Sequence, residues 1–491
     1  MADPDPAAPP PLLSFTAAAG LVGGLAAFAL TLILPAPPGL SGAGWATLGL
    51  AVLMAVWWST EPLPLGVTAL APLIVLPVVD AGGFAQLAAP FANPLVFLFL
   101  GGFMLAMAVE RWGLHRRFAY RVVAAVGTEP RRLVLGFMLA VAVLSMWISN
   151  TAAVVLMLPV AVSVITALEA ARGTDAALRN FGQSLLLGLA FAASIGGVGT
   201  LIGTPPNAML AGWLAESQGI DLSFAGWASV GIPLVAVLLP ISWWLLTRVT
   251  NPVGAEFAAS LRASGLLAQL APTGPAGTAE RRVGLIFALA GTGWLARPLL
   301  NEIPGLGGLT DPGIALTAAA ALFLTPAGEG QRRFLLTWPE AQRLPWNVLL
   351  LFGGGLSLAA AMEANGLAEW IGQGLAGFAD LPPTAFLMLT AAAVALLTSV
   401  ASNTATAAAL LPIAGSLAVA AGMDVVAVGA VVAMAASCAF LLPVATPPNA
   451  LVFASGHVTA WGMLRAGLLL NMIAVVLIAV AAQLIGPALG R

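Results

Sequence analysis

Long apolar runs separated by short polar stretches fill most of the 491-residue sequence. A helix of about 20 apolar residues is long enough to cross the hydrocarbon core of a bilayer. The pattern therefore predicts a bundle of membrane-spanning helices. We expect uninterrupted crossings at 12–34, 44–60, 63–79, 93–110, 226–247, 283–300, 312–326, 346–362 and 462–486, and crossings that are broken inside the membrane at 183–215 and 425–456.

Two further pairs of apolar runs are separated only by a polar triplet. Ser149-Asn150-Thr151 divides the first pair, and Ser402-Asn403-Thr404 divides the second. Runs this close together are typical of a re-entrant helical hairpin, whose non-helical tip is tolerated only where it is buried in protein or lines a cavity. The alternative is a pair of ordinary kinked helices. Because the pattern occurs twice, we predict hairpins at about 131–170 and 383–421.

The two triplets belong to an internal repeat. Glu110, Ser145 and Pro159 recur 253 residues later as Glu363, Thr398 and Pro412, with no gap between them. A second shared motif follows, since Thr204-Pro205-Pro206-Asn207 recurs 242 residues later as Thr446-Pro447-Pro448-Asn449. We therefore divide the chain into four parts. They are an N-terminal tail with the first helix at 1–36, repeat 1 at 37–250, a cytoplasmic linker at 251–282 and repeat 2 at 283–491.

The arginines indicate how these repeats are oriented. Cytoplasmic loops of membrane proteins carry an excess of basic residues. With a cytoplasmic N-terminus, eleven crossings and two hairpins, all 18 basic residues except Arg297 and Arg491 fall on the cytoplasmic side. The first hairpin then enters from the inside, the second enters from the outside, and the C-terminus lies outside. Opposite entry makes the repeats inverted, as in many secondary transporters. If the hairpins spanned fully, the flanking topology would survive.

Composition narrows the class of protein. Hydrophobic residues make up 60% of the chain and charged residues only 8%, which favours an integral membrane protein, here assigned to the plasma (inner) membrane. The net charge of −2 gives no sign of nucleic-acid binding. The single cysteine, Cys438, excludes disulfides within the chain and cysteine-based metal sites. No phosphate-binding loop for ATP is present.

The segments predicted at the membrane midplane contain no Asp, Glu, Lys or Arg. A proton-coupled carrier is expected to hold a titratable group in its pathway, and an enzyme needs a catalytic or metal cluster. We therefore expect neither proton coupling nor enzymatic activity. His115 and His457 are interpreted as interfacial residues.

The polar breaks themselves suit ions. A helix broken inside the membrane frees carbonyl groups at one end and N–H groups at the other. Carbonyl, Ser, Thr and Asn oxygens suit Na⁺, whereas helix N-termini suit an anion. With no basic residue at the site, a dianion would need bound cations to balance its charge. We therefore expect more than one Na⁺ as coupling ion and no organic cofactor.

These motifs resemble the divalent anion/sodium symporter family, which includes sodium-coupled dicarboxylate, citrate and sulfate carriers. The resemblance covers essentially the whole chain. It is carried by the two Ser-Asn-Thr triplets, the two Thr-Pro-Pro-Asn segments and Trp57-Trp58-Ser59-Thr60-Glu61-Pro62-Leu63-Pro64. It implies a homodimer with a scaffold domain and a mobile transport domain that works as an elevator.

The same resemblance implies the site residues. One sodium site would use Ser145, Ser149, Asn150 and Gly203, and its symmetry mate would use Thr398, Ala401, Asn403 and Ala445. Substrate would meet Ser149, Asn150, Thr151, Ser402, Asn403 and Thr404, close to Thr204, Pro205, Thr446 and Pro447. The repeats differ at Thr406, which corresponds to Ala153 in repeat 1.

The leading hypothesis is a secondary transporter for sodium-coupled symport of a C4 dicarboxylate such as succinate, malate or fumarate. A sodium-independent dicarboxylate or citrate exchanger and a sulfate carrier remain alternatives on the same fold. An anion channel is an alternative from another class.

Overall fold

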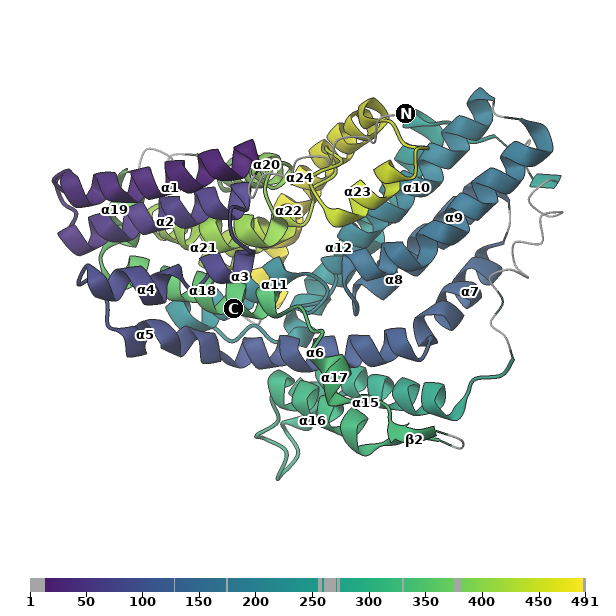
Figure 1. Cartoon of the computed structure of the whole chain (residues 1–491), viewed down its shortest axis with the longest axis horizontal. Coiled ribbons are helices and arrows are strands. Elements are labelled where there is room, and N and C mark those ends of the chain that lie inside the picture. The colour runs from purple at the N-terminus through teal and green to yellow at the C-terminus, as the bar shows by residue number, and fades with distance from the viewer. Residues whose placement is uncertain are drawn as a thin grey trace, which may run out of the picture.

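The computed structural model describes residues 14–127, 129–173, 175–254, 258–259, 271, 274–328, 331–374 and 381–488. Half of the linker predicted at 251–282 lies outside these residues. The described chain is almost entirely helical, with one two-stranded antiparallel sheet (Figure 1). Its elements are α1 (Phe15–Ile33), α2 (Gly42–Thr60), α3 (Leu65–Thr68), α4 (Ala71–Val78), α5 (Phe84–Ala88), η1 (Ala89–Ala92), α6 (Pro94–Arg111), α7 (Leu114–Val126), α8 (Pro130–Ser145), α9 (Asn150–Arg172), α10 (Ala176–Gly197), α11 (Pro205–Gln218), α12 (Phe224–Trp244), η2 (Leu245–Thr250), α15 (Thr278–Leu300), α16 (Asp311–Leu324), β1 (Pro326–Gly328), β2 (Gln331–Phe334), α17 (Trp338–Ala341), α18 (Trp346–Ala364), α19 (Leu367–Gly374), α20 (Pro383–Thr398), α21 (Asn403–Ala420), α22 (Val425–Ala436), α23 (Pro447–Ala454) and α24 (Ala460–Ala488).

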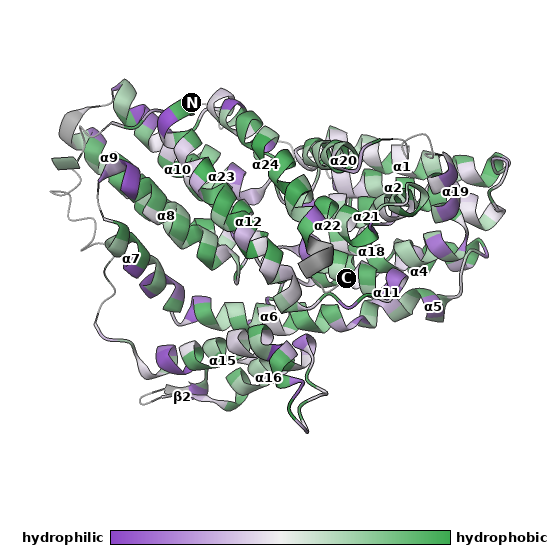
Figure 2. Ribbon diagram, turned by 180° about the vertical axis from the view of Figure 1, so that it is seen from behind, coloured by the Kyte–Doolittle hydropathy of each residue, from purple (hydrophilic) through white to green (hydrophobic). Residues whose placement is uncertain are grey.

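Among the described residues, nine helices are long and apolar enough to cross a membrane, and four apolar helices are shorter. Hydrophobic residues run along helices such as α8, α12 and α24, whereas hydrophilic residues gather on α7 and at the start of α15 (Figure 2). The structure is thus that of an integral membrane protein with many apolar helices. The number of eleven crossings stays a prediction.

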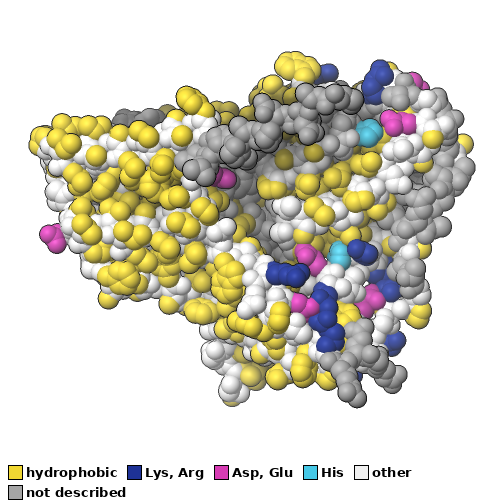
Figure 3. Space-filling view, viewed as in Figure 1, with side chains coloured by type: hydrophobic (Ala, Val, Ile, Leu, Met, Phe, Trp, Pro, Cys, Tyr) yellow, Lys and Arg dark blue, Asp and Glu magenta, His cyan; other side chains and the backbone are white. Residues whose placement is uncertain are grey.

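Charged side chains gather at one end of the molecule, which we call the basic end (Figure 3). There Arg117 on α7 pairs with Glu280 on α15, and Arg111 on α6 pairs with Glu340 on α17. Arg333 also donates to both carboxylate oxygens of Glu340, at 2.8 Å. The first two pairs join elements far apart in the sequence. One fixes α7 against α15, and the other fixes the end of α6 against α17.

Two helical hairpins hold the polar triplets. Helices α8 and α9 form the first, and α20 and α21 form the second. Helix α8 packs along α10, while α20 packs on α22 and α24. The predicted hairpin segments therefore do form paired helices. Whether they turn back within the membrane remains a prediction.

The two repeats interleave in space. Helix α11 of repeat 1 packs on α21 and α22 of repeat 2, and α23 of repeat 2 packs on α9 and α10 of repeat 1. Away from the hairpins, α6 packs on α16, and α18 packs on α3 and η1. Each hairpin therefore packs against the short helix that follows the break in the broken crossing of the other repeat. This arrangement packs the broken crossing of each repeat against the hairpin of the other.

The structure also contains two short helices that we had not predicted. Helices α7 and α19 follow α6 and α18 after Gly113 and Gly366, which adopt φ angles of 74° and 72°. A left-handed residue allows a sharp change of direction between two helices, and glycine adopts it without strain. Each helix has one polar and one apolar face and is too short to span, so a search for long apolar runs misses it.

Candidate ion and substrate site

The helix break in each hairpin lies just before the polar triplet. Helix α8 ends at Ser145, and α9 begins at Asn150 with Ser149 as its N-cap. In repeat 2, α20 ends at Thr398 and α21 begins at Asn403, with Ser402 in the cap position. The non-helical residues are thus 146–149 and 399–402. We had expected the whole triplet to interrupt the helix, but Asn150, Thr151, Asn403 and Thr404 instead form the first turns of the second helices.

In repeat 1, the Ser145 hydroxyl joins the hairpin to the neighbouring helix. It is fully buried and lies 2.5 Å from Asn150 Oδ1 and 2.7 Å from the carbonyl oxygen of Ala193 on α10. A methyl group at Gly197 would lie 2.8 Å from Asn150 Oδ1 and 3.2 Å from the Gly203 carbonyl oxygen. Side-chain and carbonyl oxygens therefore converge beside Gly197, including those of Ser145, Asn150 and Gly203. Ser149 lies at the same break, but its hydroxyl accepts from the amide of Ala152 at 3.2 Å.

Repeat 2 places a similar set of oxygens together. The buried hydroxyl of Thr398 lies 2.8 Å from Asn403 Oδ1 and 2.7 Å from the carbonyl oxygen of Ala436. Ala401 lies in the non-helical tip, and Ala445 lies in the broken segment between α22 and α23. The structure thus joins Thr398 and Asn403 directly. No contact recorded for the described residues joins either of them to Ala445.

Buried asparagines hold the broken crossings in shape. In repeat 1, Asn207 Nδ2 donates to the carbonyl oxygens of Gly197, Val198 and Thr200, at 3.1, 3.3 and 2.8 Å. In repeat 2, Asn449 Nδ2 donates to those of Ala439 and Leu442, at 2.9 and 3.0 Å. Both side chains are fully buried. The sequence motif placed these asparagines at the breaks, but their role in satisfying freed carbonyl groups was not predicted.

The predicted substrate residues lie at four helix N-termini. Thr151 and Thr404 lie in the first turns of α9 and α21, and both are half-buried. Pro205 and Pro447 begin α11 and α23, where a missing N–H costs no helix hydrogen bond. The preceding Thr204 and Thr446 are buried, and Thr446 Oγ1 accepts from the Asn449 amide at 3.2 Å. Four partly positive helix ends are therefore available to an anion.

Two features separate the ion chemistry of this site from metalloenzyme chemistry. In the part of the chain that the structure describes, no group of three or more His, Cys, Asp or Glu side chains could hold a metal ion. The oxygens that do converge are hydroxyl, amide and carbonyl oxygens, which are ligands for hard cations. Such neutral oxygens can surround Na⁺ without a carboxylate.

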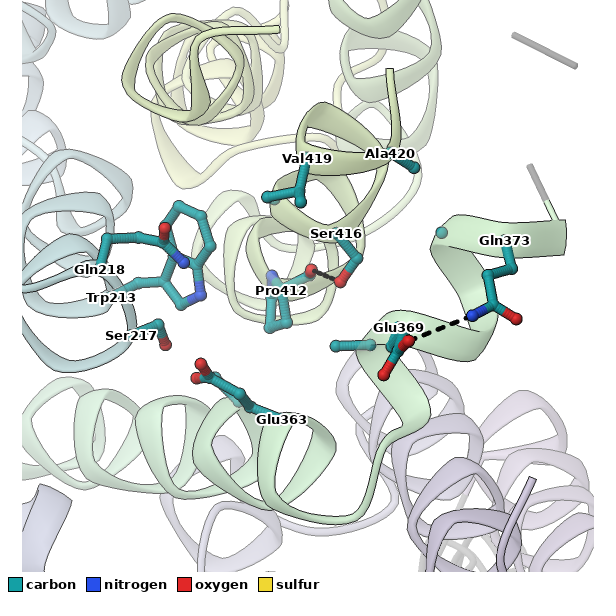
Figure 4. Close-up of a pocket in the computed structure, with 14 residues that line it drawn as sticks. Trp213, Ser217, Gln218, Glu363, Glu369, Gln373, Pro412, Ser416, Val419 and Ala420 are labelled. Atoms are coloured by element: carbon teal, nitrogen blue, oxygen red, sulfur yellow. Dashed lines mark hydrogen bonds between the residues drawn. The ribbon is translucent and has the colours of Figure 1, made fainter. Parts of the chain in front are cut away.

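A cavity leads from the basic end to the first hairpin. Its volume is 470 Å³, and it is lined by residues of α6, α7 and α9, including Ala152, which follows the first triplet directly. At the opposite end a cavity of 450 Å³ is lined by α11, α18, α19 and α21 (Figure 4). On α21 its lining begins at Pro412, well short of Asn403. In this structure, the basic-end cavity therefore comes closer to its triplet.

Interleaved helical repeats, broken crossings and paired polar tips are typical of a membrane transporter. The family model described as "Sodium:sulfate symporter transmembrane region" matches residues 16–491. The chain therefore belongs to the sodium:sulfate symporter family, as its motifs had indicated.

Curated relatives agree with this assignment. The chain is 38% identical over 484 residues to the "Sodium-dependent dicarboxylate transporter SdcS" of Staphylococcus saprophyticus, covering 96% of this chain and 92% of that protein. It is also 38% identical to SdcS of Staphylococcus aureus strain USA300, covering 95% of this chain and 91% of that protein. Two solved transporters share the fold. Alcanivorax borkumensis YdaH has a TM-score of 0.61 and 18% identity, and the match covers 89% of this chain and 98% of that one. Neisseria gonorrhoeae MtrF has a TM-score of 0.58 and 14% identity, and the match covers 96% of this chain and 95% of that one.

Proposed function

We propose that this protein is a secondary active transporter that couples the entry of Na⁺ to the symport of a C4 dicarboxylate. The observation that carries the proposal is the pair of matched oxygen clusters, Ser145 with Asn150 and Thr398 with Asn403, each at the start of a helix. The named activity of the curated relatives, sodium-dependent dicarboxylate transport, supports both the ion and the substrate class.

Each hairpin performs two tasks in this proposal. The hydroxyl, amide and carbonyl oxygens near Asn150 and Asn403 hold Na⁺, with Gly203 completing the first site and Ala401 and Ala445 completing the second. The N-termini of α9 and α21 then face substrate carboxylates, which accept hydrogen bonds from the Asn and Thr side chains. Two bound cations beside the helix ends would offset the charge of a dianion.

The remaining features of the proposal concern movement and assembly. Hairpins, broken crossings and the helices packed on them would move as a transport domain past a scaffold, in an elevator mechanism within a homodimer. The N-terminus and the basic end would be cytoplasmic, with the C-terminus outside and the protein in the plasma (inner) membrane. The first hairpin then enters from the inside and the second from the outside. The cavity that reaches Ala152 supports an inward-open state.

Sulfate is the second candidate substrate, because the matching family model is described by sodium and sulfate. An exchanger would move dicarboxylate or citrate without a sodium gradient. An anion channel would use the same helix ends without alternating states.

Uptake of labelled succinate into proteoliposomes tests these alternatives together. We expect uptake to require an inward sodium gradient, to saturate, and to show counterflow when unlabelled succinate is preloaded. Excess malate and fumarate should compete, whereas citrate and sulfate should compete weakly. Equal uptake without sodium would indicate the exchanger, and strong competition by sulfate would change the substrate. Flux without counterflow would indicate a channel.

A further inference from the structure

Two cavities at opposite ends of the molecule are equivalent under the internal repeat. The basic-end cavity is lined by Glu110, Arg116, Ala119 and Pro159 among others, on α6, α7 and α9. The residues 253 positions later are Glu363, Glu369, Gly372 and Pro412, and all four line the cavity at the opposite end. The cavities also have similar volumes, 470 and 450 Å³. We call the second one the acidic cavity.

The charges of these cavities differ at one matched position. Arg116 in the basic-end cavity corresponds to Glu369 in the acidic cavity, while Glu110 and Glu363 keep the same charge. The basic-end lining thus carries one carboxylate and one guanidinium, and the acidic lining carries two carboxylates. His115 adds little charge at neutral pH, because burial lowers the pKa of its imidazole despite the hydrogen bond to the Val109 carbonyl.

Both carboxylates of the acidic cavity are open to solvent and ions. Glu363 and Glu369 are exposed, and Figure 4 shows the Glu363 carboxylate pointing from α18 toward Ser217 on α11. Within the described part of the chain, the Glu369 carboxylate accepts a hydrogen bond only from the neutral amide of Gln373, at 3.2 Å. Among the described residues, none with a cationic side chain lines this cavity. Its field therefore repels a dianion and attracts a cation.

We infer that Glu369 and Arg116 set opposite ion preferences at the two mouths of the transporter. At the acidic cavity, Glu369 raises the local concentration of Na⁺ and lowers that of the dicarboxylate. At the basic-end cavity, Arg116 offsets the charge of Glu110, the carboxylate that both repeats carry at this position, and lets the dianion approach. A lining charge acts on a passing ion through a screened Coulomb field, so the preference weakens with salt. This inference rests on the proposed function, because it needs Na⁺ and a dianion as the transported ions.

The test measures substrate and sodium dependence separately on each side, in right-side-out and inside-out membrane vesicles. Ionic strength is varied with choline chloride at fixed sodium, between about 20 and about 300 mM, where the Debye length falls several-fold. At low salt, we expect Glu369→Gln to lower the outside KM for succinate by about two- to fivefold and to raise the sodium concentration for half-maximal uptake. High salt should remove both shifts. Arg116→Gln should raise the inside KM for succinate and leave the outside KM unchanged.

Matched variants separate charge from structure. Glu369→Asp keeps the charge and should behave as wild type, whereas Glu363→Gln removes a charge from the same cavity and should act like Glu369→Gln. Glu302→Gln removes an exposed carboxylate outside the cavity and should change neither constant. The inference would be overturned if the KM for succinate and the sodium concentration for half-maximal uptake shifted in the same direction, or if the shifts persisted at high salt. It would also be overturned if Glu369→Gln had the same effect as Glu302→Gln. In those cases the wild type still shows sodium-dependent uptake, so the proposed function stands. A wild type without sodium-dependent uptake would overturn the proposed function and this inference together.

Discussion

The two hairpin tips carry the same motif but are supported differently. In repeat 1, Thr200 Oγ1 donates to the Met146 carbonyl oxygen at 2.5 Å, which ties the hairpin tip to the broken crossing. The matching position in repeat 2 is Leu442, which has no hydroxyl to donate. Gly197 and Gly203, which approach closely in repeat 1, are replaced by Ala439 and Ala445. The non-helical segment is also longer in repeat 2, at 437–446 against 198–204.

The repeat thus preserves the proposed ion ligands more strictly than the segments around them. The hydroxyl-to-amide pair at each tip has nearly the same geometry, with 2.5 and 2.8 Å between the atoms. The loop that completes it is tightly packed in repeat 1 and less constrained in repeat 2. We therefore expect the first sodium site to be the more rigid one. The following variants test that expectation.

The largest effect is expected at the paired asparagines. Asn150→Ala and Asn403→Ala each remove an amide that accepts from the neighbouring hydroxyl and that we assign to both sodium and substrate. We expect sodium-dependent uptake to fall by about 100-fold or more, since lost hydrogen bonds to charged groups cost about 1.5–3 kcal/mol each. Asn347→Ala, at an exposed asparagine on α18, is the control. Wild-type kinetics in both variants would remove these residues from the site.

The next effect separates the repeats. Gly197→Ala places a methyl group 2.8 Å from Asn150 Oδ1, so the tip or α10 must shift. Overpacking of this kind costs about 1–3 kcal/mol, and we expect the sodium concentration for half-maximal uptake to rise about tenfold. The matched variant Ala439→Gly adds space in repeat 2 and should change sodium dependence much less. Equal effects would mean that the two sites are packed alike.

Thr200 tests the brace between the hairpin and the broken crossing. Thr200→Val keeps the shape of the side chain but removes the hydrogen bond to Met146. We expect a loss of about 1 kcal/mol, because a partly buried carbonyl is left without its partner. Thermal unfolding of the purified protein in detergent measures the change. Leu442→Val at the matched position of repeat 2 is the comparison, and a similar loss there would argue against a specific brace.

The smallest effect concerns the two cap serines. Ser149 accepts from the Ala152 amide, whereas Ser402 makes no side-chain cap hydrogen bond. Ser149→Ala should therefore lower the stability of the sodium-free protein by about 1 kcal/mol. Ser402→Ala should lower this stability by roughly a few tenths of a kcal/mol at most. A larger loss for Ser402→Ala would show that the second tip is capped in solution.

Much of this architecture could be predicted because bilayers restrict the chain to helices whose backbone groups are satisfied. The apolar runs predicted the helices, and the recurrence of Ser145, Asn150 and Pro205 predicted the paired breaks. The short helices α7 and α19 could not be found this way, since they are amphipathic and do not span. The packing of α11 on the opposite hairpin was also out of reach. It depends on three-dimensional interleaving that no local pattern encodes.

The candidate site was likewise predictable only in part. The motifs identified Asn150 and Asn403 because Ser, Asn and Thr at a helix start have a local physical meaning. The role of Asn207 in holding three carbonyl oxygens depends on the shape of an unwound segment, which the sequence alone does not define. From the sequence, Glu110 and Glu363 were identified only as matched positions of the repeat. The structure places both in the linings of the two end cavities.

The central claim is that each repeat supplies one sodium site for the symport of a single dicarboxylate. It is tested most directly by measuring labelled sodium and labelled succinate fluxes in the same proteoliposomes. We predict at least two sodium ions per succinate in the wild type, and a lower ratio when Ser145→Ala or Thr398→Ala disables one tip. Succinate uptake with no accompanying sodium flux would contradict the account.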